Sequence, residues 1–217
     1  MSHRAFKDKL YPQFARIAQA LASDRRLELI DLLAQAPRHV EALAEETSMS
    51  LANVSQHLQT LRQARLVETS REGTRVVYRL AGDDVLALWL ALRGVAERRL
   101  AEVARLRAEF AIPGSEGPLV ARESLREGVV LIDVRPRVEF ENGHLPGALS
   151  VPIEELEAKL AELPHDRPIV TYCRGEYCQF ADEAVALLRE RGFEAVRLEG
   201  GWPEWLLEGR PVEAGLE

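Results

Sequence analysis

The chain has few of the features that mark a secreted or membrane protein. It has only two cysteines, Cys173 and Cys178, which are too few for a disulfide framework and, five residues apart, would crosslink almost nothing. No apolar run approaches the roughly 20 residues that span a bilayer, and residues 1–8 lack the apolar core of a signal peptide. We therefore expect a cytoplasmic protein without a membrane partner.

The charge of the chain is unevenly distributed. The 217 residues carry a formal net charge of −7, which by itself argues weakly against nucleic-acid binding. Residues 1–110 hold 17 Lys and Arg against 14 Asp and Glu, whereas residues 111–217 hold 11 against 21. A mildly basic half joined to a strongly acidic half is typical of a protein in which only one half meets DNA.

The chain also changes pattern at one place. Residues 111–118 contain two prolines and two glycines, which favour turns and predict a linker. Before it, over 1–110, apolar residues recur at helical spacing. After it, over 119–217, apolar runs alternate with helical periods, which predicts an α/β domain with a central parallel sheet. The sequence thus predicts two domains, the first mainly helical.

The first half predicts a series of helices and one hairpin. Helices are expected over residues 5–22, from a Ser23 cap to Leu33, over 40–46, from a Ser50 cap onward, and as one long amphipathic helix over 83–110. In the fourth helix Leu51, Val54, Leu58 and Leu61 are expected to point inward. Residues 66–70 and 75–80 are rich in β-formers and predict a hairpin through 71–74.

Polar side chains on the outer face of the fourth helix are candidates for DNA contacts. Asn and Gln can form bidentate hydrogen bonds with adenine, and Ser suits phosphate contacts. The candidate DNA-binding residues are Ser50, Asn53, Ser55, Gln56, His57 and Thr60, with Arg71 and Arg75 at the hairpin. A polar helix face alone is more often merely solvated, so the inference also depends on the hairpin and the charge distribution.

Residues 50–67 and 71–80, above all Ser55-Gln56-His57-Leu58, resemble the ArsR/SmtB family of bacterial repressors. The resemblance implies a winged helix-turn-helix that binds double-stranded operator DNA, and the apolar stripe of 83–110, completed by the first helix, predicts a homodimer. Arg65 stands where family members often carry Gly. The cysteines or histidines that hold the family's metals are absent from their positions, so we expect no metal and no cofactor.

In the second half, residues 168–172 predict a buried strand that runs into a loop. The loop residues are Cys173, Arg174, Gly175, Glu176, Tyr177 and Cys178, and a helix is expected from near Gln179. Ligands of parallel sheets bind beyond the carboxyl ends of the strands. Loop N–H groups, the helix N-terminus and Arg174 favour a reactive thiolate at Cys173, whereas Glu176 opposes it. A zinc half-site would require two further ligands.

Four motifs in order resemble the rhodanese family: Asp133-Val134-Arg135, residues 143–148, the Cys173 loop and residues 200–205. The resemblance implies that Cys173 takes sulfane sulfur from a donor such as thiosulfate or polysulfide, that residues 174–178 cradle it, and that Asp133 and Arg135 shape the pocket. Cys178 stands where many sulfurtransferases have a cation or a small polar residue. A second thiol at this position can resolve a persulfide to a disulfide.

Three functions remain open on this basis. The first is a transcriptional repressor whose rhodanese-like domain senses or carries sulfane sulfur through Cys173 and Cys178. The second is an enzyme, a thiosulfate or persulfide sulfurtransferase with an accessory DNA-binding domain. The third is a repressor with a degenerate binding module. The intact Cys173 argues against the third, and Cys178 in place of a cation favours the first over the second.

Overall fold

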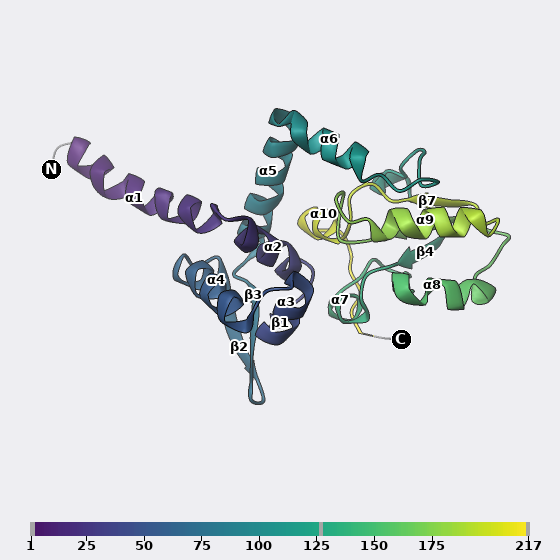
Figure 1. The fold of residues 1–217 in the computed structure, drawn as a ribbon, viewed down its shortest axis with the longest axis horizontal. Coiled ribbons are helices and arrows are strands. Elements are labelled where there is room, and N and C mark those ends of the chain that lie inside the picture. Colours follow the sequence, from purple (N-terminus) through teal and green to yellow (C-terminus); the bar gives the residue numbers. More distant parts are fainter. Residues whose placement is uncertain (1–2, 126–127, 216–217) are drawn as a thin grey trace. The chain divides into compact units, whose positions relative to one another are not determined.

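The computed structural model describes residues 3–125 and 128–215, which form two compact units, Met1–Ala91 and Leu92–Glu217 (Figure 1). The first unit contains the helices of the winged helix-turn-helix and its hairpin, and the second contains a parallel sheet covered by helices. Our predicted boundaries, 1–110 and 119–217 with a linker at 111–118, divide the chain by function and stay a prediction.

The first unit is built from short helices around one apolar core. Its elements are α1 (His3–Leu21), α2 (Asp24–Leu33), β1 (Arg38–His39), α3 (Val40–Thr47), α4 (Leu51–Gln63), β2 (Val67–Glu72), β3 (Arg75–Leu80) and the start of α5 (Asp83–Arg99). Leu29, Leu43 and Leu58, from α2, α3 and α4, are all fully buried in this core. The helix-turn-helix predicted from apolar spacing is therefore confirmed.

Helix α4 begins and ends with recognisable capping structures. The Ser50 hydroxyl accepts a hydrogen bond from the Asn53 backbone N–H over 3.3 Å, as expected for an N-cap. At the other end, the Leu66 N–H donates to the Leu61 carbonyl and the Arg65 N–H to the Arg62 carbonyl, each over 3.0 Å. This is a Schellman motif, and it requires the positive φ of 62° seen at Arg65.

One inward residue was wrongly predicted. Val54, Leu58 and Leu61 are buried, but Leu51 is half exposed. Leu51 shares their face of the helix, yet it is the first residue of α4 and lies in the turn that extends beyond the core.

Strands β2 and β3 form the predicted antiparallel hairpin, with Glu72 opposite Arg75 and the tip exposed. A third, two-residue strand, β1, pairs with β3 through Arg38 opposite Tyr78. We did not predict β1, because two residues are too short to give a sequence period.

The single long helix predicted over 83–110 is wrong. The structure has α5 (Asp83–Arg99) and α6 (Ala101–Glu109), separated at Leu100, whose backbone is extended with φ −111° and ψ 105°. An ion pair of 2.9 Å between Arg107 and Glu97 joins the two helices. The apolar spacing continues through the break, which carries neither Pro nor Gly, so the sequence gives no signal for it.

The second unit is an α/β fold around four parallel strands in the order β5-β4-β6-β7. The strands and helices are β4 (Val130–Asp133), α7 (Arg137–Asn142), β5 (Leu149–Ser150), α8 (Ile153–Lys159), β6 (Ile169–Tyr172), α9 (Phe180–Glu190), β7 (Ala195–Arg197) and α10 (Trp202–Leu207), with short 3-10 helices at Arg122–Ser124 and Leu160–Glu162.

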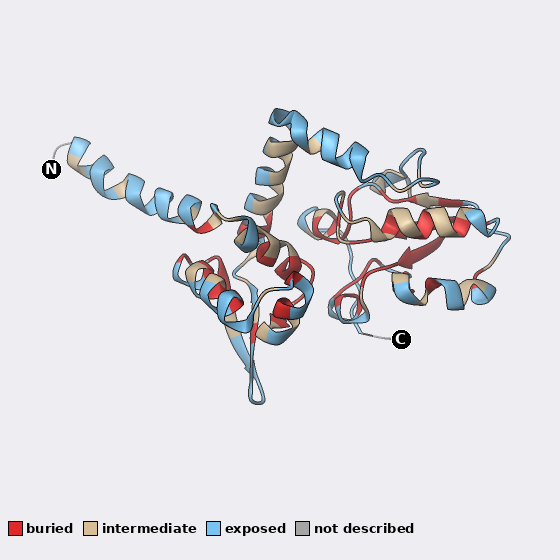
Figure 2. Ribbon diagram, viewed as in Figure 1, coloured by how far each residue is buried: buried red, intermediate tan, exposed pale blue. Residues whose placement is uncertain are grey.

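Alternate residues of the strands point to opposite sides of this sheet. Ile132 packs in one cluster with Leu156 of α8 and Leu188 of α9. Leu131 packs in the other cluster with Phe140 of α7 and Trp202 of α10, as well as further residues. Figure 2 shows that burial in this unit is concentrated on the strands and on one side of α9. The predicted parallel sheet is confirmed.

Candidate functional site

The cysteine loop lies at the carboxyl edge of the sheet. β6 ends at Tyr172, the loop runs from Cys173 to Cys178, and α9 begins at Phe180. Asp133, the last residue of the neighbouring strand β4, is in register with Tyr172. The Cys173 loop therefore occupies the position in which parallel sheets bind ligands.

Both cysteines are free thiols, and they face one another across the loop. Cys173 is fully buried and Cys178 is partly buried. The Cys173 Sγ lies 3.4 Å from the Cys178 carbonyl oxygen and 3.8 Å from the Gly175 carbonyl oxygen. Gly175 has φ 132°, which a residue with a side chain rarely adopts, so this glycine allows the loop to curl.

The two cysteines of the loop differ in the direction in which their pKa values are shifted. Burial raises the pKa of Cys173 well above the ordinary cysteine value, and its hydrogen bond to the Cys178 side chain raises it further. The same hydrogen bond lowers the pKa of Cys178. Burial of the Cys173 sulfur therefore opposes the factors that favour a thiolate at this position, and it was not among the effects weighed from the sequence.

The positive charge beside the cysteines comes from a residue that the sequence analysis missed. Arg197, the last residue of β7, donates to the Gly175 carbonyl oxygen over 2.7 Å and pairs with Asp182 over 2.6 Å. Its charge acts to lower the pKa of Cys173 against the larger effect of burial. Arg197 is far from Cys173 in the sequence, and it comes close only because β7 pairs with β6, which the sequence analysis did not establish.

Arg174, which we expected to supply that charge, is directed elsewhere. Its Nε donates to the fully buried carboxylate of Glu139 over 2.9 Å, and its guanidinium lies 5.7 Å from the Phe180 ring centre. Arg174 therefore ties the loop to α7.

The rest of the loop has distinct environments. Gly175 is buried, Glu176 is partly exposed, and Tyr177 is exposed at the rim of the loop.

The Gly200-Gly201-Trp202 motif lies directly under the loop. The Trp202 backbone N–H donates to the Cys173 carbonyl oxygen over 3.1 Å. A Cβ on Gly201 would lie 2.3 Å from that oxygen and 2.4 Å from the Gly175 nitrogen. No side chain fits there, and this close approach fixes the inner side of the loop.

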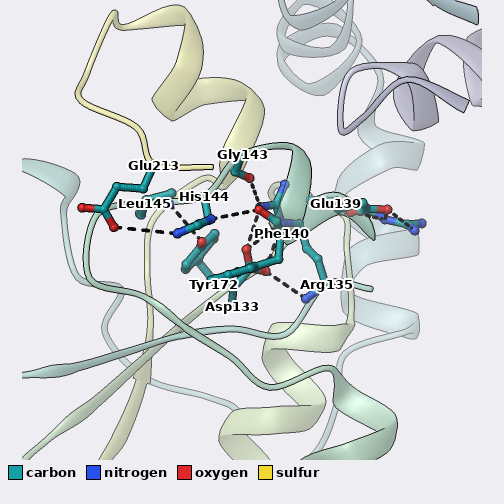
Figure 3. A network of polar contacts seen from close by, with 10 residues as sticks. Asp133, Arg135, Glu139, Phe140, Gly143, His144, Leu145, Tyr172 and Glu213 are labelled. Carbon is teal, nitrogen blue, oxygen red and sulfur yellow. Dashed lines mark hydrogen bonds and ion pairs between the residues drawn. The ribbon is translucent and has the colours of Figure 1, made fainter. Parts of the chain in front are cut away.

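Asp133 and Arg135 form a buried ion pair of 2.6 Å at the edge of β4 (Figure 3). Arg135 also donates to the Gly143 carbonyl oxygen over 2.8 Å, and the Tyr172 hydroxyl accepts from the Leu145 N–H over 3.1 Å. Both members of the pair are fully buried. Asp133 is in register with Tyr172, the residue before the cysteine loop. Arg135 holds Gly143 and Tyr172 holds Leu145, so residues 143–145 are fixed against the ends of β4 and β6.

The same network continues to the end of the described chain. His144 stacks on the Phe140 ring with ring centres 3.6 Å apart and lies 3.7 Å from the carboxylate of Glu213. Glu213 also accepts from the Gly147 N–H over 3.0 Å. The C-terminal segment thus fixes the motif over 143–148 (Figure 3).

The candidate DNA contacts lie on α4 and the hairpin. Ser50, Asn53, Ser55 and Gln56 are exposed, His57 and Thr60 are half-buried, and Arg71 and Arg75 are exposed near the hairpin tip. The Thr60 hydroxyl donates to the Gln56 carbonyl oxygen over 3.1 Å. All eight residues reach the surface of the first unit, whereas Val54, Leu58 and Leu61 of α4 are buried.

Within residues 3–125 and 128–215, no three His, Cys, Asp or Glu side chains are grouped so that they can hold a metal ion. Over the same residues, no helix has the length and apolar character needed to cross a bilayer.

Comparisons with known proteins match both units. The model of the rhodanese-like domain matches residues 119–208, and that of the bacterial regulatory proteins of the arsR family matches residues 23–69. The chain is 48% identical over 214 residues to the HTH-type transcriptional regulator Rv0324 of Mycobacterium tuberculosis. The aligned region covers 96% of this chain and 94% of that protein.

Shorter matches cover the two halves separately. A sulfurtransferase of Allochromatium vinosum is 35% identical over 89 residues, 41% of this chain and 81% of that protein. The solved homodimeric winged helix-turn-helix DNA-binding domain of Mb0332 from Mycobacterium bovis is 48% identical, with a TM-score of 0.43, and the match covers 46% of this chain and 91% of that one.

Proposed function

Since the chain belongs to the ArsR family of winged helix-turn-helix transcriptional regulators and carries a rhodanese-like domain, we propose that it is a repressor whose DNA binding responds to sulfane sulfur at Cys173 and Cys178. The observation that carries the proposal is the pair of free thiols that face one another within one loop at the carboxyl edge of the sheet.

The DNA-binding part of the proposal uses α4 as the recognition helix. Val54, Leu58 and Leu61 anchor it in the core, which leaves Gln56 and its neighbours to meet base edges. Arg71 and Arg75 of the hairpin reach the phosphate backbone. In a homodimer, two such helices lie about 34 Å apart and meet successive major grooves.

The chemistry begins with a proton transfer within the pair. Cys173 donates its S–H to Cys178, whose thiolate is the more stable of the two. Transfer of that proton to Cys178 leaves a thiolate at Cys173 beside the guanidinium of Arg197. This thiolate attacks the outer sulfur of a donor such as thiosulfate or polysulfide, and the S–S bond of the donor breaks with release of sulfite or the shortened polysulfide.

A second displacement completes the response. Cys178, once deprotonated, attacks the Sγ of the Cys173 persulfide; a Cys173–Cys178 disulfide forms and hydrosulfide leaves with the electron pair. The donor's sulfane sulfur is the oxidant of the cysteine pair, so no other oxidant is required. The product is a closed loop that differs in shape from the dithiol loop.

The alternative function is turnover as a sulfurtransferase. It requires an acceptor thiol or cyanide to reach the persulfide before Cys178 does. Cys178 packs beside the buried Cys173 within the same loop, and this proximity favours the internal reaction over an external acceptor.

The proposal is tested with full-length protein treated with sodium tetrasulfide. Wild type is expected to form the disulfide. Cys178→Ser should accumulate a persulfide at Cys173, formed more slowly because the base is lost, and Cys173→Ser should bind no sulfur, as measured by peptide mass spectrometry. Operator binding, measured on the same samples, should weaken only in wild type, which alone forms the disulfide. DNA affinity unchanged by tetrasulfide in wild type, together with steady thiocyanate production from cyanide, would establish the sulfurtransferase instead.

A further inference from the structure

Two arginines from α5 and α6 lie beside the exposed tyrosine of the cysteine loop. The guanidinium carbon of Arg93 lies 5.0 Å from the ring centre of Tyr177, and that of Arg107 lies 5.5 Å from it. Both distances are within the range of a cation–π contact. All three residues belong to the second unit, although they come from segments far apart in the sequence.

Arg93 also contacts the other end of the loop. Its Nη2 lies 3.4 Å from the carboxylate of Glu204 on α10, and a Cβ on Gly175 would lie 3.4 Å from the same guanidinium. The side chain of Arg93 is only 11% exposed. Arg93 therefore fits closely between Tyr177 and Gly175, and its packing depends on the shape of the loop.

The helix that carries Arg93 starts in the winged helix-turn-helix. Val85 and Leu86 of α5 are buried in the first unit, and the indole N–H of Trp89 donates to Asp31 of α2 over 2.9 Å. From Leu92 onward the same helix belongs to the second unit. Only one helical turn separates Trp89 from Arg93.

Closing the disulfide must move the part of the loop that Arg93 contacts. The two Sγ atoms have to approach to about 2.05 Å. The backbone of Cys173 is held in place, because its carbonyl oxygen accepts a hydrogen bond from the Trp202 N–H and Gly201 packs against it. The displacement therefore falls on Cys178 and on its neighbour Tyr177.

We propose that Arg93 is the positioning residue that couples the cysteine loop to α5. A change in the loop acts on α5 through Arg93, and DNA binding acts on the loop through the same contact. The inference rests on the proposed function for the stimulus, but the second direction of the coupling needs no sulfur chemistry. Thermodynamic linkage requires that a loop state which changes DNA affinity is itself changed by bound DNA.

The experiment uses full-length protein and a duplex selected from a random-sequence library by the untreated wild type. Iodoacetamide labelling of Cys178 is timed with and without the duplex, and DNA affinity is measured with and without sodium tetrasulfide. The variants are Arg93→Gln and Arg93→Lys. Arg99→Gln, an exposed arginine later on α5, is the matched control.

For wild type and Arg99→Gln, bound DNA is expected to change the labelling rate about tenfold, and tetrasulfide to change DNA affinity about tenfold. For Arg93→Gln both ratios should fall to near one, while sulfur still adds to Cys173. Arg93→Lys should lose most of both ratios, because Lys lacks the planar guanidinium that lies beside the Tyr177 ring.

A purely structural role for Arg93 would instead lower DNA affinity equally in treated and untreated protein and leave both ratios as in wild type, which overturns the inference. An unchanged labelling rate in wild type on binding DNA overturns it as well. Absence of both a Cys173 persulfide and a Cys173–Cys178 disulfide from tetrasulfide-treated wild type, with the labelling ratio still lost in Arg93→Gln, would overturn the proposed function and leave the coupling residue standing.

Discussion

The backbone N–H of Trp202 and the carbonyl oxygen of Cys173 are joined by a hydrogen bond of 3.1 Å, which ties the start of α10 to the first residue of the loop. The bond is possible only because residue 201 has no side chain, since a Cβ there would lie 2.3 Å from the same oxygen. The rhodanese-like motif over 200–205 thus serves the geometry of the cysteine loop.

We expect Gly201→Ala to destabilise the second unit by about 3 kcal/mol, because the added methyl group meets backbone atoms that cannot move independently. Chemical denaturation followed by tryptophan fluorescence measures the loss. Gly94→Ala on α5 is the control, since its Cβ meets only the flexible end of Arg98, and it should be neutral or slightly stabilising. Equal stabilities for Gly201→Ala and wild type would contradict the packing described for the loop.

Alkylation of the two cysteines should depend differently on pH. The lowered pKa of Cys178 gives it a thiolate below the usual midpoint of about 8.5, whereas the raised pKa of Cys173 delays its thiolate to more alkaline pH. Rates of iodoacetamide labelling, resolved by peptide mass spectrometry, should therefore rise first at Cys178. In urea both profiles should converge near the usual value, and faster labelling of native Cys173 at neutral pH would refute the assignment.

Arg65→Gly should stabilise the first unit by about 1 kcal/mol. The backbone at residue 65 has φ 62°, and a Cβ in this region costs roughly 1–2 kcal/mol, partly offset by the greater freedom of glycine in the unfolded chain. Arg62→Gly, within α4, is the opposite control and should cost about 1 kcal/mol. Urea unfolding monitored through Trp89 distinguishes the two, and a loss of stability in Arg65→Gly would show that the arginine side chain has a further role.

Substitutions on α4 and on the hairpin should affect DNA binding in different ways. Gln56→Ala is expected to reduce the preference for the selected operator by about 1–3 kcal/mol, because it removes a base contact. Arg71→Gln and Arg75→Gln should weaken binding to all sequences and reduce the salt slope by about one each. Arg79→Gln is the control and should leave the salt slope unchanged, since Arg79 is paired with Glu68 instead of being available to phosphates. An unchanged operator preference in Gln56→Ala would place recognition elsewhere.

The exposed apolar side chains of α1 predict a homodimer. Phe6, Tyr11 and Phe14 are each about three-fifths exposed, and Figure 2 shows most of α1 as exposed. Burying one such ring is worth about 2 kcal/mol, so a charge at this place should disrupt association. We expect Phe14→Glu to be monomeric by light scattering at micromolar concentration, while Val138→Glu, on α7 of the second unit, stays dimeric. A monomeric wild type would remove the basis of the two-fold arrangement on DNA.

Much of the fold could be predicted from the sequence because its signals are local. Apolar spacing, the Ser50 cap and the hairpin turn expected at residues 71–74 each act within a few residues of chain, and the structure confirms the cap and the hairpin, whose strands pair up to Glu72 and Arg75. The break at Leu100 could not be predicted, because it coincides with no Pro or Gly and the apolar pattern continues across it.

The site was harder to predict, because charge and burial there are set by packing between distant segments. The sequence places Arg174 next to Cys173, but the fold turns Arg174 towards Glu139 and brings Arg197 to the sulfur. Likewise, a loop at a sheet edge suggests an accessible thiolate, whereas Cys173 is fully buried. Neighbours in sequence thus gave the right residue types but the wrong partners.

The segment over 111–118 is tied down at several carbonyls. Arg189 of α9 donates to the carbonyl oxygens of Gly114 and Glu116 over 3.1 and 2.6 Å, and Gln179, at the start of the same helix, donates to that of Phe110. A linker that contains prolines and glycines and makes no contacts would be flexible and would not transmit movement from one element to the next. These hydrogen bonds restrain residues 111–118, so a displacement of the end of α6 is transmitted to α9, the helix that follows the cysteine loop.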